Sequence, residues 1–352
     1  MYDQLTASVV GCGSGGSLSL EALSASDRFK LVAATDLRPD VSAAIAAKYG
    51  IQTFTHHEEM FSRCPTDVVC VSTYAPTHEA VAMHALKLPL KGVLVEKPLA
   101  DTVASGRRIL AACKARKLNL AVPHGLLVGE TPMEILSRVR SGEIGALKLV
   151  DIQVAGWDII NAGIHWLNYF VHLTDLEPID YVMAICDAST RTYRDSMQVE
   201  TLGVTYVQTK SGVRCVLNTG DEVRTNRAGK GTVYRIVGTA GQIEFWGWEN
   251  GYYIQNAKFP MGTVLTPVQL PRSGHQRHLE NMADMIDNGA TDHSVAESSL
   301  FALEICEAAY LSNRHRCKVT FPLEKFAPIE PSDWDPGQAY TGVGGGRDGR
   351  KL

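Results

Sequence analysis

The 352-residue sequence has no large excess of charge of either sign. Lysine and arginine together number 34, aspartate and glutamate together number 38, and the formal net charge is only −4. The two signs are scattered along the chain, whereas a protein that binds nucleic acid carries a basic patch or stripe. We therefore expect no nucleic-acid partner.

Long apolar runs and paired cysteines are also missing. No stretch approaches the ~18 apolar residues of a membrane span, and the start, Met1-Tyr2-Asp3-Gln4, lacks the positive charge of a secretory signal. The eight cysteines form no C-x-x-C pair and have no regular spacing, so they predict no disulfide framework. These absences predict a cytoplasmic protein with no membrane partner, whose thiols are reduced and mostly buried.

Histidine pairs are present, but without a full set of metal ligands. His56-His57 and the pair His275 and His278 are not part of an ordered group of four ligands, so the sequence predicts no metal site. What the chain does have is ordinary globular composition, with 45% apolar and 20% charged residues. At ~150 residues per domain, its length suggests two domains.

Residues 1–123 alternate short β-branched runs with segments of helical periodicity. Continuous apolar strands that alternate with helices are typical of a doubly wound parallel sheet, so this part predicts an α/β dinucleotide-binding (Rossmann) domain. The predicted strands are Ala7–Val10, Leu31–Thr35, Val68–Ser72, Val93–Glu96 and Leu118–Val122. The predicted helices are Gly16–Ser26, Val41–Tyr49, Thr77–Leu86 and Thr102–Arg116.

The rhythm changes in residues 124–325, where longer alternating strands are separated by glycine-containing turns. This pattern predicts an α+β domain with a large, open, mainly antiparallel sheet. The predicted strands are Leu147–Val154, Tyr181–Asp187, Thr201–Thr209, Val213–Thr219, Val233–Val237 and Gln242–Phe245, and the predicted helices are Pro132–Ser141, Ile160–His172, His275–Asn288 and Val295–Ser312. Residues 326–352 are rich in proline and glycine and predict an arm or a flexible tail.

The first predicted strand runs directly into a glycine-rich turn with the pattern G-x-G-x-x-G. It reads Gly11-Cys12-Gly13-Ser14-Gly15-Gly16, and a helix follows it. The glycines allow a tight turn and close approach of backbone N–H groups to a pyrophosphate, which faces the start of the helix. The turn therefore predicts a bound dinucleotide.

An acidic residue at the end of the second strand supports this interpretation. Asp36 follows Gly16 by about 20 residues, where a carboxylate accepts hydrogen bonds from both ribose hydroxyls of NAD and repels the 2′-phosphate of NADP. Arg38, separated from Asp36 by Leu37, is able to bind a 2′-phosphate. The sequence therefore favours NAD and leaves NADP as the alternative.

Five further segments occur in a fixed order along the chain. They are Ser72-Thr73-Tyr74-Ala75-Pro76 with His78, Glu96-Lys97-Pro98 after a predicted strand, Gly142-Glu143-Ile144-Gly145, Asn161-Ala162-Gly163-Ile164-His165, and Ala308-Ala309-Tyr310-Leu311-Ser312. In these segments the sequence resembles the glucose–fructose oxidoreductase / inositol dehydrogenase / MocA (Gfo/Idh/MocA) family. The resemblance implies a sugar or polyol dehydrogenase in which the first two segments line the cofactor and Lys97 and His165 are catalytic.

The chemistry of these residues agrees with that implication. Lys97 stands at the carboxyl end of a parallel strand, the edge at which such sheets bind ligands, where an ammonium group can donate to a substrate hydroxyl and carry a proton. Asn161, His165 and Asn168 have the spacing i, i+4, i+7, so on a helix they share one face. Because a buried unpaired polar group costs ~1–3 kcal/mol, we expect this face to meet water or a ligand.

Two departures from the family pattern bear on the substrate. The family usually carries aspartate where this chain has Asn161, which orients a hydroxyl but takes no proton, so proton removal falls to His165 or Lys97. His124, in Pro123-His124-Gly125, stands where many relatives have a polar or arginine-containing stretch and is a candidate substrate contact. Trp157 is a candidate for stacking on a sugar ring.

The sequence thus predicts an NAD-dependent dehydrogenase that oxidises a secondary hydroxyl of a sugar, a polyol or the sugar ring of a glycoside. One alternative is an NAD-dependent glycosidase that oxidises the sugar transiently, and another is a non-catalytic regulator that senses the nucleotide. We also expect a homodimer or homotetramer that covers the open sheet face, as in relatives.

Overall fold

The computed structural model describes residues 4–187, 189, 192–326, 337–339 and 349. The chain forms two compact units, one of residues 1–125 and 271–300 and the other of residues 126–270 and 301–352. Most of the predicted tail at 326–352 lies outside the described residues. No helix in the described ranges has both the length and the apolar character that a bilayer crossing needs.

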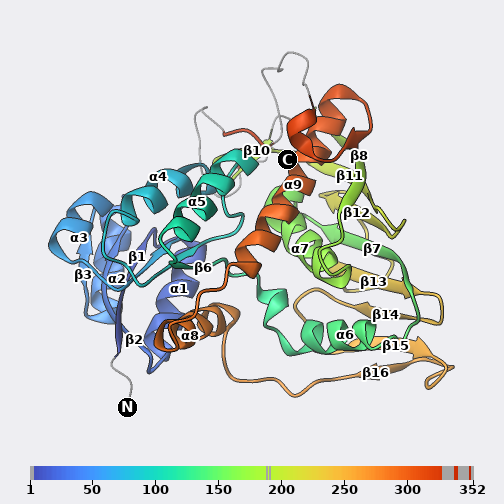
Figure 1. Cartoon of the computed structure of the whole chain (residues 1–352), viewed down its shortest axis with the longest axis horizontal. Helices are drawn as coiled ribbons and strands as arrows, with labels where there is room; N and C mark the ends of the chain where they lie inside the picture. Colours follow the sequence, from blue (N-terminus) through green and yellow to red (C-terminus); the bar gives the residue numbers. More distant parts are fainter. Residues whose placement is uncertain (1–3, 188, 190–191, 327–336, 340–348, 350–352) are drawn as a thin grey trace. The chain divides into compact units, whose positions relative to one another are not determined.

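The first unit is built on a six-stranded sheet in the order β3-β2-β1-β4-β5-β6, and every pairing in it is parallel. Its strands are β1 (Leu5–Val10), β2 (Phe29–Thr35), β3 (Gln52–Phe54), β4 (Val68–Val71), β5 (Gly92–Val95) and β6 (Asn119–Ala121). Its helices are α1 (Ser14–Ala25), α2 (Pro39–Tyr49), α3 (His57–Arg63), α4 (Ala75–Ala85), α5 (Val103–Ala115) and α8 (Gly274–Asp287). Figure 1 shows α4 and α5 together on one side of this sheet and α1 and α8 together on the other. The predicted doubly wound fold is confirmed.

Helix α8 was expected to close the second domain, but it packs in the first unit. Leu279, Met282 and Ala283 are fully buried in the same apolar cluster as strand residues of β1, β4 and β5. The approach is so close that a Cβ added to Gly92 meets the Met282 sulfur at 2.3 Å. Helical periodicity predicts that a helix has an apolar face, but not which core that face joins.

The second unit holds a nine-stranded sheet in the order β16-β15-β14-β13-β7-β12-β11-β8-β17. Only the β7–β12 pairing is parallel, so the expected mainly antiparallel sheet is confirmed. The strands are β7 (Leu147–Ala155), β8 (Ile179–Asp187), β11 (Leu202–Thr209), β12 (Arg214–Gly220), β13 (Thr232–Gly238), β14 (Gly241–Phe245), β15 (Tyr252–Asn256), β16 (Thr263–Leu265) and β17 (Val319–Thr320), with a separate hairpin of β9 (Thr192–Arg194) and β10 (Met197–Val199). The other elements of this part are the single turns η1 (Gly125–Leu127), η2 (Ile159–Gly163) and η3 (Leu323–Lys325), the helices α6 (Glu130–Arg140) and α7 (Ile164–Leu173), and α9 (Ser294–His315), which begins in the first unit.

The two faces of this sheet differ in character. Helices α6 and α7 lie against one face (Figure 1), where Trp166 and Tyr169 of α7 pack their rings against Tyr234 and Phe245. Cross-strand pairing places another row of side chains on the opposite face, because paired residues point the same way. The row runs through Met183, Tyr206, Val216, Asp151, Arg235, Glu244 and Tyr253. Helices α6 and α7 therefore cover the first face, whereas the second face carries both apolar and charged groups.

Candidate functional site

The glycine-rich turn has the geometry that a dinucleotide requires. Gly11 has φ +86°, and a Cβ there meets the Ser72 carbonyl oxygen at 2.6 Å, while a Cβ on Gly16 meets the Gly11 oxygen at 1.8 Å. Both positions therefore need glycine. A Cβ on Gly13, at the start of α1, has nothing within 4 Å, and the helix has no side-chain cap there. The space and the uncapped N–H groups fit a pyrophosphate.

Asp36 lies beside this turn, as its position after β2 predicts. Its Oδ2 accepts a hydrogen bond from the Cys12 N–H at 3.0 Å, and its Oδ1 accepts from the Arg38 backbone and Nε at 3.0 Å each. Burial alone raises the pKa of Asp36, but the hydrogen bonds from Arg38 and Cys12 outweigh it, and the pKa is lowered. The carboxylate is therefore charged at neutral pH and fits the ribose hydroxyls of NAD, with Arg38 held against it.

The loops after β4 and β5 are joined by a buried histidine. The ring of His78 has Nε2 2.9 Å from the Thr73 carbonyl oxygen and Nδ1 3.0 Å from that of Pro98. Both carbonyls belong to segments that the sequence analysis assigned to the cofactor. His78 therefore fixes these loops at the carboxyl edge of the sheet rather than facing a ligand.

Glu96 and Lys97 follow β5 at the same edge. Glu96 is buried, and its Oε1 lies 2.6 Å from Nε2 of His275 on α8, while Oε2 accepts a hydrogen bond from the Lys97 backbone. Burial raises the pKa of Glu96, but His275 and Lys97 outweigh it and lower the pKa. A Cβ added to Gly15 meets the Glu96 side chain at 3.1 Å, so the Glu96 side chain packs directly against the glycine turn. The sequence did not predict His275 as its partner, because α8 was assigned to the other domain.

His124 is not the substrate contact that the sequence suggested. Its side chain is buried, its Nε2 lies 2.8 Å from the Ser299 hydroxyl, and its carbonyl oxygen lies 3.1 Å from Nε2 of His278. Both partners belong to the same unit as His124. This histidine therefore ties the segment after β6 to α8 and the start of α9.

In the second unit, Asn161 does not lie on the same regular helix as His165. Residues Ile159–Gly163 form a single π-helical turn, η2, and α7 begins only at Ile164. The spacing argument for one polar face is therefore wrong for Asn161. Asn168 lies on α7 with His165, as the spacing predicts, but it is fully buried and does not face water. Only His165 is partly exposed.

The π-helical turn is held by buried charged groups that the sequence analysis missed. Oδ1 of Asp158 accepts hydrogen bonds from the Asn161 backbone at 2.8 Å and from its Nδ2 at 3.0 Å. Oδ2 of Asp158 pairs with Arg194 Nη1 at 2.8 Å, and the Arg194 guanidinium also lies 4.3 Å from the centre of the Trp157 ring. One ring face of Trp157, the predicted sugar platform, is therefore occupied by Arg194.

A second buried acid supports the same turn. Glu200 Oε1 accepts a hydrogen bond from the Ile159 N–H at 2.6 Å, and Oε2 accepts one from the Tyr310 hydroxyl at 3.0 Å. Burial, followed by the charge of Asp158, raises the pKa of Glu200 to about 8. At neutral pH this carboxyl therefore keeps its proton, which removes one negative charge from a buried cluster.

His165 has an aromatic neighbour that was not among the site residues predicted from the sequence. The indole of Trp248 meets the His165 imidazole edge-on, with ring centres 5.1 Å apart and planes at 89°. Trp248 is 62% exposed, so a large apolar surface lies next to the predicted catalytic histidine. Its position between β14 and β15, in Trp246-Gly247-Trp248, was the available signal.

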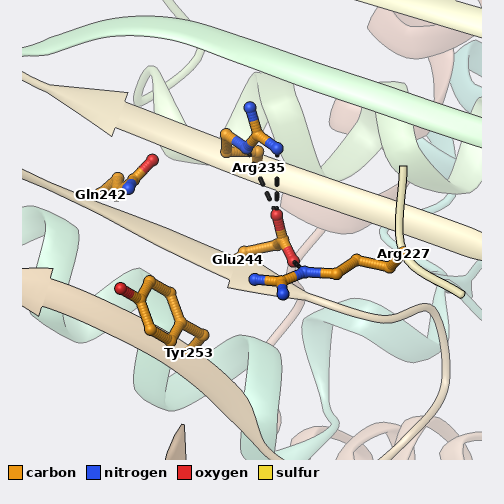
Figure 2. A pocket seen from close by; sticks show the side chains of 5 residues that line it. All are labelled: Arg227, Arg235, Gln242, Glu244 and Tyr253. Carbon is orange, nitrogen blue, oxygen red and sulfur yellow. Dashed lines mark hydrogen bonds and ion pairs between the residues drawn. The ribbon is translucent and has the colours of Figure 1, made fainter. Parts of the chain in front are cut away.

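A separate hollow of about 380 Å³ opens on the other face of the nine-stranded sheet. Figure 2 shows Arg227 and Arg235 on either side of the Glu244 carboxylate, with Gln242 and Tyr253 completing the wall. Glu244 is hydrogen-bonded to both guanidinium groups. None of the cofactor-binding, substrate-binding or catalytic residues predicted from the sequence lines this hollow.

Comparison with known proteins finds a family model that matches the segment containing the glycine turn. Residues 5–124 match the GFO_IDH_MocA model, described as an oxidoreductase family with an NAD-binding Rossmann fold. Over these residues the chain is similar to the Gfo/Idh/MocA family. The family resemblance expected from the motifs is confirmed, and so is a nicotinamide dinucleotide as the cofactor class.

Other similar proteins match different parts of the chain. It is 29% identical over 178 residues to an inositol 2-dehydrogenase of Rubrobacter xylanophilus, covering 46% of this chain and 50% of that protein. The chain thus matches about half the length of the curated relative.

The solved structure of an aldose-aldose oxidoreductase from Caulobacter crescentus is similar over 91% of this chain and 100% of its own, with a TM-score of 0.78 and 20% identity. The structure of GenD2 from gentamicin A biosynthesis, in complex with NAD, has a TM-score of 0.75 and 22% identity over 91% of this chain and 97% of its own. At these identities, the structural likeness shows the fold alone.

Proposed function

We propose that the chain is an NAD-dependent dehydrogenase that oxidises a secondary hydroxyl of a polyol or a sugar. The observation that carries the proposal is the joint position of the glycine turn, Asp36 and Lys97 at one edge of the parallel sheet. The names of the relatives, an inositol 2-dehydrogenase and an aldose-aldose oxidoreductase, support the substrate class.

Each polar group is given a distinct role in this proposal. Lys97 donates a hydrogen bond to the reacting hydroxyl, and His165 accepts its proton as the carbon loses a hydride. The bound dinucleotide supplies the hydride acceptor. Asn161, with its amide fixed by Asp158, binds a neighbouring hydroxyl. Trp248 offers an apolar surface beside His165 for the carbon face of the ring.

The test is a screen of myo-inositol, other polyols and free aldoses with NAD and with NADP, read as the absorbance of the reduced cofactor. We expect net reduced cofactor with at least one of these compounds and a preference for NAD. Lys97→Ala should lower kcat by at least ~100-fold and leave the Kd for NAD within about threefold of the wild type. Normal turnover in this variant contradicts the role of Lys97, and product without net NADH favours the glycosidase alternative.

We propose further that a second copy of the chain covers the open face of the nine-stranded sheet. Ile185 is 78% exposed there, next to the exposed side chains of Met183, Leu202 and Val204 on β8 and β11. A continuous apolar strip of this kind is costly to leave in water. Light scattering should give at least a dimer mass, and Ile185→Lys should lower it; a wild-type monomer contradicts this part of the proposal.

A further inference from the structure

Two histidines and a glutamate gather on the outside of the first unit, outside the predicted dinucleotide site. His57 and Glu58 begin α3, and His84 lies in the last turn of α4. One ligand atom from each residue lies within 4.8 Å of the other two, and this is the only such group of three among the described residues. The sequence predicts no metal site because it shows no ordered group of four ligands, and His84 is distant from His57 along the chain.

The two imidazole rings are held in place by packing. The His57 and His84 rings have centres 5.2 Å apart at an angle of 75°, and the ring of Phe61 contacts both at 5.4 Å. Both histidines are half-buried. Because the rings pack edge to face in a three-ring cluster, little side-chain freedom remains to be lost when a ligand binds.

The two acids at the start of α3 differ in their contacts. Glu58 Oε2 lies 3.4 Å from Nδ1 of His57. The adjacent Glu59 is paired with Arg63. Glu58 is thus the acid that faces the two rings.

We propose that His57, Glu58 and His84 bind one divalent transition-metal ion of the zinc class, which fastens α3 to the end of α4. In a tetrahedral zinc site with bonds of ~2.0–2.1 Å, donor atoms lie ~3.4 Å apart. Nδ1 of His57 and Oε2 of Glu58 are already 3.4 Å apart. All three ligand atoms lie within 4.8 Å of one another, so small side-chain rotations bring them to this spacing. Two imidazoles and one carboxylate suit Zn²⁺, Co²⁺, Ni²⁺ or Cu²⁺ rather than Mg²⁺ or Ca²⁺.

The experiment is a calorimetric titration of Zn²⁺ into the chelator-treated full-length protein. We expect one Zn²⁺ per chain with a Kd on the order of micromolar, and a Tm that rises with Zn²⁺. His57→Ala and His84→Ala should each weaken binding at least 10-fold, and Glu58→Gln should weaken it less. His56→Ala removes a neighbouring histidine outside the group and serves as the matched control, with unchanged affinity.

Cobalt provides an independent readout of geometry. Co²⁺ in the wild-type protein should give the strong visible absorption of a four-coordinate ion, and this absorption should be absent in His84→Asn. Circular dichroism checks that each variant is folded, and His57→Gln and His84→Asn replace any alanine variant that is not. Absence of stoichiometric binding at ~100 μM Zn²⁺, or binding that is unchanged in both histidine variants, overturns the proposal. Neither result depends on dehydrogenase activity.

Discussion

Removal of the Arg194 guanidinium should cost much more stability than the loss of an exposed ion pair does. The side chains of Arg194 and Asp158 are 3% and 1% exposed, and the pair is 2.8 Å long. Arg194→Met leaves the Asp158 carboxylate buried with no opposite charge. Breaking a buried pair in this way costs about 3–5 kcal/mol, whereas an exposed pair contributes ~0–1 kcal/mol.

Urea unfolding followed by tryptophan fluorescence measures this cost, since Trp157 lies against Arg194. With a slope of ~2 kcal/mol/M, a loss of ~4 kcal/mol lowers the midpoint by about 2 M. Arg63→Met, which removes the exposed pair with Glu59, is the matched control and should change the midpoint by less than ~0.5 M.

The double variant Arg194→Met with Asp158→Asn separates an unpaired charge from a simple loss of packing. Removing both charges leaves no ion buried alone, so we expect the double variant to regain more than half of the lost stability. The reasoning is refuted if Arg194→Met costs less than ~1 kcal/mol, or if the double variant is no more stable than the single one.

Four further substitutions test the dinucleotide turn, a buried acid and the aromatic surface. Gly13→Ala should fold normally but weaken NAD binding at least 10-fold, because its Cβ enters the open space that fits the pyrophosphate. Gly16→Ala should instead destabilise the unit itself, because its Cβ meets a carbonyl oxygen at 1.8 Å. Calorimetry measures the NAD affinity and thermal melting measures the stability. The folded protein keeps a proton on Glu200 up to a pKa of about 8, against an ordinary value of 4.5. Wild-type stability should therefore fall as pH rises from about 5 to 8, and Glu200→Gln should remove that slope from the urea midpoint; an unchanged slope contradicts this assignment. Trp248→Ala should raise KM for the polyol at least fivefold and leave the Kd for NAD unchanged; an unchanged KM removes Trp248 from the substrate site.

The first unit could be predicted from the sequence largely because its signals are local. A largely apolar strand, a glycine turn and an acid after the next strand lie within 36 residues, and the Cys12 to Asp36 hydrogen bond joins the turn to the acid. The elements that were missed in this unit are β3, of three residues, and α3, of seven. Neither is long enough to show a period.

The second unit was harder to predict because its special features depend on distant partners. The spacing of Asn161 and His165 is that of an α-helix, but η2 takes a π-helical form in which Asp158 and Glu200 accept its N–H groups. Glu200 lies 41 residues from Ile159 along the chain. No local pattern reports such a contact. The same holds for Arg194. Arginine is usually exposed, so the sequence alone predicts a surface position, but the side chain is buried in the structure.

The buried Asp158 also bears on the asparagine that stands where the family usually has an acid. Because Asp158 accepts a hydrogen bond from Asn161 Nδ2 at 3.0 Å, an aspartate at position 161 puts a second carboxylate against the first. Asn161→Asp should therefore lower stability at pH 8 by about 1–3 kcal/mol, with a smaller loss at pH 5, where one of the two carboxyls takes up a proton.

Asn161→Asp combined with Asp158→Asn keeps one acid in this pair and should regain most of the stability, as urea midpoints at the two pH values measure. Equal stability of Asn161→Asp and the wild type at pH 8 refutes the argument. If both results are obtained, the neighbouring Asp158 explains Asn161, because an amide donates a hydrogen bond to this buried carboxylate and a second carboxylate does not. Proton removal then falls to His165 or Lys97.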